Sequence, residues 1–216
     1  MPSLPRLYAI LDVDTLSARG LDPRAVIDIW LDAGIRLVQL RAKSLGAGDM
    51  VALADDLVIR TRAAGATLII NDRVDIAMMV GADGVHIGQD DLSPEQVRDI
   101  EHDDGESDLI VGLSTHTLDQ FRAGLASPVD YLAVGPVFST TTKIGAEPAV
   151  GLSLVTEAAA VSGECPLVAI GGITLANAPS VLAAGADSVA VISDLLNLEG
   201  GGDLAARARA FVSACE

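Results

Sequence analysis

Short apolar runs alternate with longer amphipathic stretches along the chain. The runs are rich in Val, Ile and Leu, and the stretches between them carry apolar residues at helical spacing. Eight runs are predicted to be strands: Leu7–Leu11, Leu37–Arg41, Thr67–Ile70, Gly84–Ile87, Leu109–Leu113, Tyr131–Val134, Leu167–Ile170 and Ser188–Ile192. Helices are predicted between them, among them Pro23–Ala33, Met50–Ala64, Pro94–Ile100, Leu152–Val161 and Ala176–Ala184.

This alternation indicates the fold class. Near-continuous apolar strands separated by helices are typical of a parallel sheet that is buried on both faces. Eight strand–helix units favour a closed (β/α)₈ TIM barrel over a doubly wound sheet, which usually has about five or six strands. We therefore expect an α/β protein in which residues 1–216 form a single barrel domain, because no linker interrupts the pattern.

The composition agrees with this fold and excludes several classes of function. Aromatic residues make up only 3% of the chain, so the core must be aliphatic, as barrel interiors are. A net charge of −16 argues against nucleic-acid binding, because a phosphate backbone would be repelled. Asp outnumbers Glu by 22 to 8, and both high-salt adaptation and GC-rich coding remain open as explanations. The sequence also leaves the oligomeric state open, a homo-oligomer included.

The sequence carries no sign of membrane insertion or export. It has no uncharged apolar stretch long enough to span a bilayer, and its first residues lack the pattern of a secretory signal. Cys165 and Cys215 show neither metal-site nor redox spacing, so we interpret them as free thiols. Together these features favour a cytoplasmic protein with no membrane partner.

Candidate functional residues cluster at the carboxyl ends of the predicted strands. In a parallel barrel all carboxyl ends meet at one rim, which is where active sites are built. Gln39, Arg41 and Lys43 share parity there, so their side chains should point the same way. An Arg beside a Lys suits a diphosphate group, although a surface salt-bridge pair is the alternative. Lys143 is the only other lysine of the chain, and it too follows a strand and a polar cluster.

Two aspartates at the same rim indicate a metal site. Asp72 and Asp91 end neighbouring strands, and two close carboxylates repel each other unless a cation lies between them. Mg²⁺ binds through one or two carboxylates together with substrate phosphates. The alternatives are a helix N-cap for Asp72 and a solvated surface position for Asp91. Asp90 has the opposite parity and is expected to face away.

The last strands suggest a second phosphate site. Gly171, Gly172 and Ser193 follow strands seven and eight, where barrels of the phosphate-binding type hold phosphate on backbone N–H groups. A simple turn is the alternative for the glycine pair. His86 and His116 lie near the rim without the further ligands of a zinc set, and both structural and proton-transfer roles stay open for them.

Taken in order, these segments resemble the thiamine phosphate synthase (thiamine-phosphate pyrophosphorylase) family. The matching segments span residues 39–193, and the ordered set is far more specific than any one of them. They are Gln39-Leu40-Arg41-Ala42-Lys43, Asn71-Asp72-Arg73, Gly84-Val85-His86-Ile87-Gly88-Gln89-Asp90-Asp91, Gly112-Leu113-Ser114-Thr115-His116, Gly135-Pro136-Val137-Phe138 with Thr140, Thr142 and Lys143, Ala169-Ile170-Gly171-Gly172-Ile173 and Val191-Ile192-Ser193.

The resemblance implies a transferase of thiamine biosynthesis. It would join 4-amino-2-methyl-5-(diphosphooxymethyl)pyrimidine to a (carboxy)thiazole ethyl phosphate, releasing diphosphate by a dissociative, Mg²⁺-assisted mechanism. The pyrimidine diphosphate would be held by Gln39, Arg41, Lys43, Asn71, Ser114 and Lys143, of which Arg41, Lys43, Ser114 and Lys143 would be catalytic. Asp72 and Asp91 would hold Mg²⁺. The thiazole phosphate would be held by Thr140, Thr142, Gly171 or Gly172, Ile192 and Ser193.

Two alternatives are weighed against this interpretation. A thiazole tautomerase-like barrel would share the thiazole phosphate site, but it would not need paired metal carboxylates beside a full diphosphate set. A non-catalytic phosphate-binding barrel should have lost Lys143 or Asp72, and both are present. One departure from the family concerns Asp194, whose charge next to Ser193 would repel phosphate; strand parity predicts that it points outward.

Overall fold

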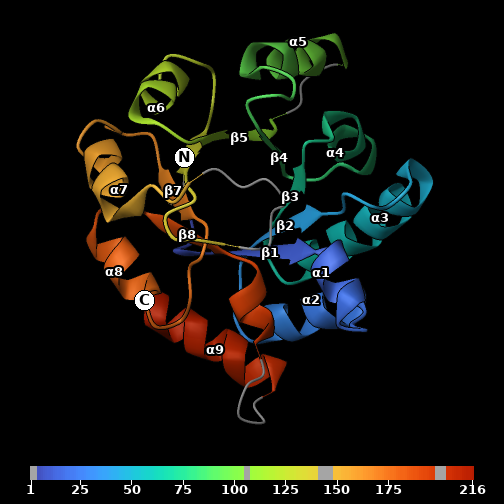
Figure 1. The fold of residues 1–216 in the computed structure, drawn as a ribbon. Coiled ribbons are helices and arrows are strands. Elements are labelled where there is room, and N and C mark those ends of the chain that lie inside the picture. Colours follow the sequence, from blue (N-terminus) through green and yellow to red (C-terminus); the bar gives the residue numbers. More distant parts are fainter. Residues whose placement is uncertain (1–3, 105–107, 141–147, 198–202) are drawn as a thin grey trace.

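The computed structural model describes residues 4–104, 108–140, 148–197 and 203–216, and its strands close into a parallel barrel (Figure 1). Each strand pairs with the next one in sequence, and β8 pairs with β1. This confirms the predicted (β/α)₈ barrel, with strand limits that differ from the predicted ones by two residues at most, at the end of the fifth strand. The strands are β1 (Leu7–Asp12), β2 (Leu37–Arg41), β3 (Thr67–Asn71), β4 (Gly84–Ile87), β5 (Ile110–Thr115), β6 (Tyr131–Val134), β7 (Leu167–Ile170) and β8 (Ser188–Val191).

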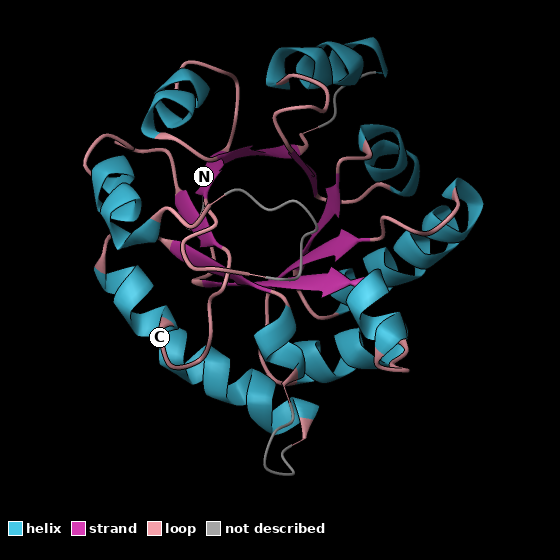
Figure 2. Ribbon diagram, in the orientation of Figure 1, coloured by secondary structure: helices cyan, strands magenta, loops and turns pink. Residues whose placement is uncertain are grey.

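The helices form an outer ring around the barrel (Figure 2). They are α1 (Val13–Ala18), α2 (Pro23–Asp32), α3 (Ala47–Ala63), α4 (Val74–Val80), α5 (Pro94–Asp104), α6 (Leu118–Gly124), α7 (Gly151–Ala159), α8 (Ala178–Ala183), the 3₁₀ helix η1 (Ser193–Leu196) and α9 (Leu204–Cys215). The last helix, α9, packs against both α2 and α8. Among the described residues, every helix is too short or too polar to cross a bilayer.

Two apolar layers pack this fold. The larger one fills the space between barrel and helices and contains Val38 and Leu40 of β2. The smaller one fills the barrel interior and contains Leu37 of the same strand, with Tyr8 and Tyr131. Inward-facing and outward-facing positions therefore alternate along β2. This alternation places the side chain of Gln39 on the inward side of the barrel, together with rim positions of the same parity.

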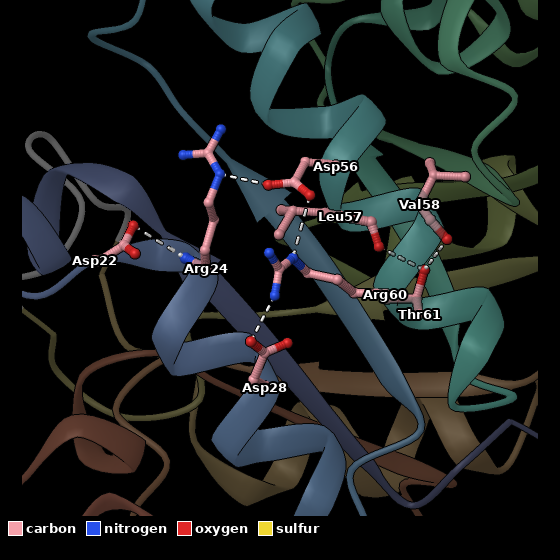
Figure 3. Close-up of polar contacts among 8 residues, drawn as sticks. All are labelled: Asp22, Arg24, Asp28, Asp56, Leu57, Val58, Arg60 and Thr61. Atoms are coloured by element: carbon pink, nitrogen blue, oxygen red, sulfur yellow. Dashed lines mark hydrogen bonds and ion pairs between the residues drawn. The ribbon is translucent and has the colours of Figure 1, made fainter.

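Ion pairs between Arg and Asp join helices on the outside of the barrel (Figure 3). Arg24 of α2 pairs with Asp56 of α3, and Arg60 of α3 pairs with both Asp56 and Asp28. The Asp22 carboxylate accepts a hydrogen bond from the backbone N–H of Arg24 at 3.3 Å and so caps α2, a capping position that fits the proline at its first residue. Part of the excess acidic charge is thus neutralised within the surface itself.

Candidate active site at the carboxyl rim of the barrel

A cavity of about 1090 Å³ opens at the carboxyl ends of the strands. Residues from both halves of the chain line it, from Tyr8 to Asn197. The structure brings these predicted site residues together in it: Gln39, Arg41, Lys43, Asn71, Asp72, Asp91, Ser114, Thr140, Gly171, Gly172, Ile192 and Ser193. Thr142 and Lys143 lie outside the described residues, so the structure gives no position for them.

The cations at the carboxyl end of β2 are paired with carboxylates. Arg41 pairs with Asp12, a buried residue at the end of β1 whose other oxygen accepts from the Thr15 backbone N–H at 2.8 Å. Lys43 pairs with Asp72, and its side chain remains half exposed. Both cations also line the cavity, so they form salt bridges and face the candidate ligand space at the same time. Sequence reasoning missed Asp12, because it predicted the strand to end one residue earlier.

Asp72 has an unusual backbone conformation. Its φ is 61°, in the left-handed region that non-glycine residues seldom adopt, and its N–H donates to the carbonyl of His86 at 2.8 Å. The N-cap of α4 is Arg73 and no side chain caps that helix, so the interpretation of Asp72 as a helix cap is wrong. A strained residue at a cavity wall is a mark of a functional position.

The carboxylates of Asp72 and Asp91 lie close enough to affect each other. Burial and the neighbouring Asp91 carboxylate raise the pKa of Asp72, and the hydrogen bond from Lys43 only partly offsets them. Asp91 is exposed, and one of its oxygens accepts from the Gly88 backbone N–H at 2.8 Å. Asp90 was expected to face away but also lines the cavity, because a turn follows β4 in place of further strand.

A hydrogen-bonded chain of buried side chains crosses the barrel interior beneath the cavity. Gln39 Nε2 donates to the Tyr8 hydroxyl at 2.9 Å, and the hydroxyls of Tyr8 and Tyr131 lie 3.0 Å apart. His86 then contacts the Tyr131 hydroxyl through Nδ1 at 2.9 Å and Ser114 Oγ through Nε2 at 2.8 Å. Burial raises the pKa of both tyrosines, so the phenols are neutral.

Sequence reasoning missed both tyrosines. A signal was available, since Tyr8 and Tyr131 are the only tyrosines of the chain and both fall within predicted strands of an otherwise aliphatic barrel. The second rim histidine, His116, holds a loop: its Nδ1 lies 2.6 Å from the carbonyl oxygen of Gly135. That contact supports a structural role for His116. The side chain of His86, in contrast, lies inside the barrel and belongs to the hydrogen-bonded chain.

The glycine pair after β7 has a packing role of its own. Both residues have positive φ, 101° at Gly171 and 63° at Gly172. A Cβ atom at Gly171 would lie 2.4 Å from Pro136 Cβ, and one at Gly172 would lie 2.7 Å from the carbonyl oxygen of Ser139. The loop after β6 therefore packs directly on the glycine backbone, so the pair shapes this end of the cavity as a turn and as a contact surface.

Asp194 is neutralised by a partner. It follows Ser193 in η1, where the strand has already ended, so the parity argument for its direction was wrong. Its carboxylate lines the cavity, but it pairs with Arg207 of α9 and accepts from the Leu175 N–H at 2.7 Å. A negative charge this close to the predicted phosphate site is tolerable because the arginine offsets it.

Arg19 is a further cavity cation that sequence reasoning missed. It follows α1 and donates to the carbonyl oxygen of Leu196 at 2.5 Å. The helix α1 was not predicted, so no residue after it was considered for the rim. A capping signal was present, because the Asp12 side chain binds the N–H three residues later, at Thr15.

Comparison with known proteins identifies the family of this chain. The family model described as thiamine monophosphate synthase matches residues 7–195. A thiamine-phosphate synthase of Koribacter versatilis is 43% identical over 198 residues, covering 89% of this chain and 90% of that protein. One from Chloroflexus aurantiacus is 40% identical over 208 residues, covering 96% of this chain and 93% of its own.

Solved structures extend the agreement to the fold. The thiamine phosphate pyrophosphorylase from Pyrococcus furiosus superposes with a TM-score of 0.83 at 29% identity, covering 98% of this chain and 95% of that one. A 3-hexulose-6-phosphate synthase is 15% identical with a TM-score of 0.65, which shows the fold alone. With the family model and the relatives both covering most of its length, the chain belongs to the thiamine monophosphate synthase family.

Proposed function

We propose that the rim cavity binds a pyrimidine diphosphate and a thiazole phosphate and joins them into thiamine phosphate, with release of diphosphate. The observation that supports this most is that the two ends of one cavity are lined by different kinds of group, each suited to an anion. Cations and paired carboxylates lie after β2 to β5, whereas glycine backbone and Ser193 lie after β6 to β8. The family to which the chain belongs and the names of its relatives support the same activity.

The diphosphate end would be formed by Arg41 and Lys43 with Asn71 and Ser114. All four line the cavity. Arginine grips phosphate oxygens bidentately and lysine acts as a point charge, so together they offset the charge that builds up on departing diphosphate. Lys143 would complete this set. Gln39 would hold the pyrimidine side of the same substrate.

The residues at this end fit Mg²⁺. Asp72 and Asp91 offer two adjacent carboxylates, and the pKa of Asp72 is raised first by burial and further by the negative charge of Asp91, which a cation would compensate. Among the described residues no group of three or more metal-binding side chains is present. Two protein carboxylates are enough for a Mg²⁺ site, because the ion takes its other ligands from water and substrate phosphates. When bound, it would neutralise charge on the diphosphate leaving group.

The chemistry needs positioning more than a protein nucleophile. The carbon–oxygen bond between the pyrimidinylmethyl group and diphosphate breaks, and its electron pair leaves with the diphosphate. The resulting cation is stabilised by the amino group of the pyrimidine ring. The thiazole nitrogen then donates its lone pair to that carbon and forms the new carbon–nitrogen bond. Side chains at the rim would hold the two reactants in line and stabilise the charge of the leaving group.

The thiazole phosphate would occupy the opposite end of the cavity. Ser193 and backbone N–H groups of Gly171 or Gly172 would hold its phosphate, as barrels do after strands seven and eight. Thr140, Thr142 and Ile192 would complete that end. We further propose that residues 1–216 act as one barrel domain, and that the protein works in the cytoplasm, where its free Cys165 and Cys215 would stay reduced.

A coupled assay with both substrates tests this function directly. The purified protein is incubated with the pyrimidine diphosphate, the thiazole phosphate and Mg²⁺, and thiamine phosphate is detected by oxidation to a fluorescent thiochrome. We expect product only when all three are present. If the folded protein makes none, or if it converts the thiazole alone, the synthase proposal is wrong and a tautomerase-like activity replaces it. The paired carboxylates of Asp72 and Asp91 favour the synthase, because a tautomerase has no diphosphate to neutralise.

A further inference from the structure

A chain of five hydrogen-bonded side chains crosses the barrel interior, and its two end residues are proposed to bind the substrate. Gln39 on β2 and Ser114 on β5 stand at the two ends, with Tyr8, Tyr131 and His86 between them. The three inner residues are at most 8% exposed. Hydrogen bonds between buried groups are stronger than in water and act together, so the state of one link constrains the next.

Ring packing fixes the middle of this chain. The ring of Tyr131 stacks on His86 with centroids 5.6 Å apart and meets Tyr8 edge to face at 6.1 Å. Room for the Tyr131 ring comes from Gly112 on β5, where a Cβ atom would lie 2.0 Å from Cζ of that ring. The Tyr131 ring therefore packs directly on the backbone of β5, and its contacts with His86 and Tyr8 limit the positions that its hydroxyl can take.

The donors and acceptors give the chain a direction. The amide nitrogen of Gln39 can only donate, so the Tyr8 oxygen accepts its hydrogen. If the Tyr8 hydroxyl then donates to Tyr131, and Tyr131 donates to Nδ1 of His86, every hydroxyl hydrogen has an acceptor. Nδ1 as acceptor leaves the hydrogen of a neutral imidazole on Nε2, which points at Ser114 Oγ.

The opposite direction leaves a group unsatisfied. Tyr131 would donate to Tyr8, and the Tyr8 hydroxyl hydrogen would then need another acceptor. Within the part of the chain that the structure describes, that hydroxyl contacts only Gln39 and Tyr131. A buried donor without a partner is costly, because it has lost its water and gained nothing. The direction from Gln39 to Ser114 is therefore the favoured one.

We propose that this buried chain holds His86 in its Nε2–H form and thereby fixes Ser114 as a hydrogen-bond donor toward the cavity, with Tyr131 and His86 as positioning residues. Ser114 Oγ accepts from His86 and has its own hydrogen left to donate, which suits a phosphate oxygen. The amide of Gln39 keeps its carbonyl oxygen as an acceptor, which suits an amino group on the substrate. The role of the two end residues rests on the function proposed above, but the direction of the chain does not.

The tautomer of His86 can be measured without any substrate. The protein is labelled with ¹⁵N-histidine, and long-range proton–nitrogen spectra distinguish Nε2–H from Nδ1–H rings. The chain contains three histidines, so His86→Gln identifies the signal. We expect the Nε2–H form in the ligand-free wild type at neutral pH. A predominant Nδ1–H form, or a doubly protonated ring, overturns the proposal.

Two matched variants then test how the chain acts. Tyr8→Phe and Tyr131→Phe each remove one buried hydroxyl, but only Tyr131 contacts His86. We expect Tyr131→Phe to give a mixture of His86 tautomers and to lower kcat/KM for the pyrimidine diphosphate about three- to tenfold, the size of one neutral hydrogen bond. Tyr8→Phe should keep the Nε2–H form. Equal tautomer populations in the two variants would overturn the proposal.

The outcomes separate this proposal from the proposed function. If the tautomer changes in Tyr131→Phe while kcat/KM stays at the wild-type value, the chain has the inferred direction but Ser114 does not bind the substrate. If synthase activity is absent altogether, the ¹⁵N spectra of the wild type still decide the direction. They also decide it if either Phe variant fails to fold, because that measurement needs only the unmodified protein and the identifying variant.

Discussion

Asp72 combines two unfavourable features in one residue. Its backbone lies in the left-handed region, and burial beside Asp91 raises the pKa of its carboxyl group. A fold gains nothing from either feature, and residues that keep such costs cluster at functional sites. This is the strongest argument at the residue scale that the carboxylate pair serves a bound cation.

The variant Asp72→Asn should separate stability from activity. A carboxyl whose pKa is raised by folding favours the protonated state, so its ionised form costs stability above that pKa, and the cost vanishes as the pH falls below it. Asn is neutral and tolerates positive φ. We expect an unchanged or higher melting temperature of the ligand-free protein and a loss of about 10²–10³ in diphosphate release.

A control for that variant lies three residues further along the chain. Asp75 is exposed at the start of α4, and its pKa is lowered by the hydrogen bond from Arg73. Asp75→Asn should therefore leave diphosphate release unchanged and lower the melting temperature slightly. A parallel loss of melting temperature and activity in Asp72→Asn would contradict the interpretation of Asp72 as a strained metal ligand.

Asp12 illustrates a second prediction at this scale. One oxygen holds Arg41 and the other caps α1 through the Thr15 N–H. Asp12→Asn can keep the cap but loses the charge that orients Arg41, so we expect KM for the pyrimidine diphosphate to rise about three- to tenfold at near-constant stability. Asp12→Ala should also lose the cap, lowering the free energy of unfolding by about 1 kcal/mol. Steady-state kinetics with denaturant unfolding check both, and equal stability of the two variants would contradict this account.

At the scale of elements, the limits of the strands were predicted to within two residues, whereas the short helix α1 was not predicted. A strand buried on both faces gives a short continuous apolar run, and eight such runs recur along the chain. The six residues of α1 bury only Val13 and Leu16, too few to establish a helical period. The segment after β8 was read as continuing strand, although η1 begins there, because Ser193 and its neighbours fit either geometry.

The contact between α2 and α3 should weaken in acid. The hydrogen bond from Arg24 lowers the pKa of Asp56 below its usual value of 3.8, so its stabilising effect is present above that pH and is lost as the pH falls through the lowered pKa. Asp56→Asn should lower the melting temperature slightly at pH 7, with the difference from wild type shrinking below about pH 4. Asp55→Asn is the matched control, since Asp55 forms no ion pair with any described residue. A difference that is independent of pH would contradict this account.

At the scale of the whole molecule, the net charge of the protein and the charges at the cavity have opposite effects on an anionic ligand. The net charge of −16 repels anionic substrates at long range, while the described cavity wall carries Arg19, Arg41 and Lys43. Local cations and a bound metal would have to overcome that field. Binding of diphosphate should therefore depend strongly on Mg²⁺.

Thermal melts with inorganic diphosphate test this dependence. We expect diphosphate to raise the melting temperature in the presence of Mg²⁺, because a ligand that binds only the native state stabilises it. Excess chelator should abolish most of the shift, and Asp72→Asn should show little shift with or without metal. An equal shift in chelator would exclude Asp72 and Asp91 as ligands of a metal that the diphosphate requires.

The candidate site could be predicted in its residues but not in their partners. A position in the last residues of a strand or just after it was enough to place Gln39, Ser114 and the two aspartates at one rim. The link between Tyr8 and Tyr131 joins residues 123 positions apart, and it depends on ring packing inside the closed barrel. A sequence pattern predicts which face of a strand a side chain occupies. Contacts across the barrel interior can be identified only from the closed three-dimensional structure.

The scarcity of lysine has a practical consequence for anyone who handles this protein. Lys43 is the only lysine among the described residues, its side chain is 53% exposed, and it stands at the cavity mouth; Lys143 is the only other one in the chain. Dyes, biotin esters and amine-coupled sensor chips would therefore attach at Lys43 in the mouth of the cavity, at Lys143 and at the amino terminus. Labelling by such reagents should inactivate the protein, and immobilisation is better done through an engineered tag.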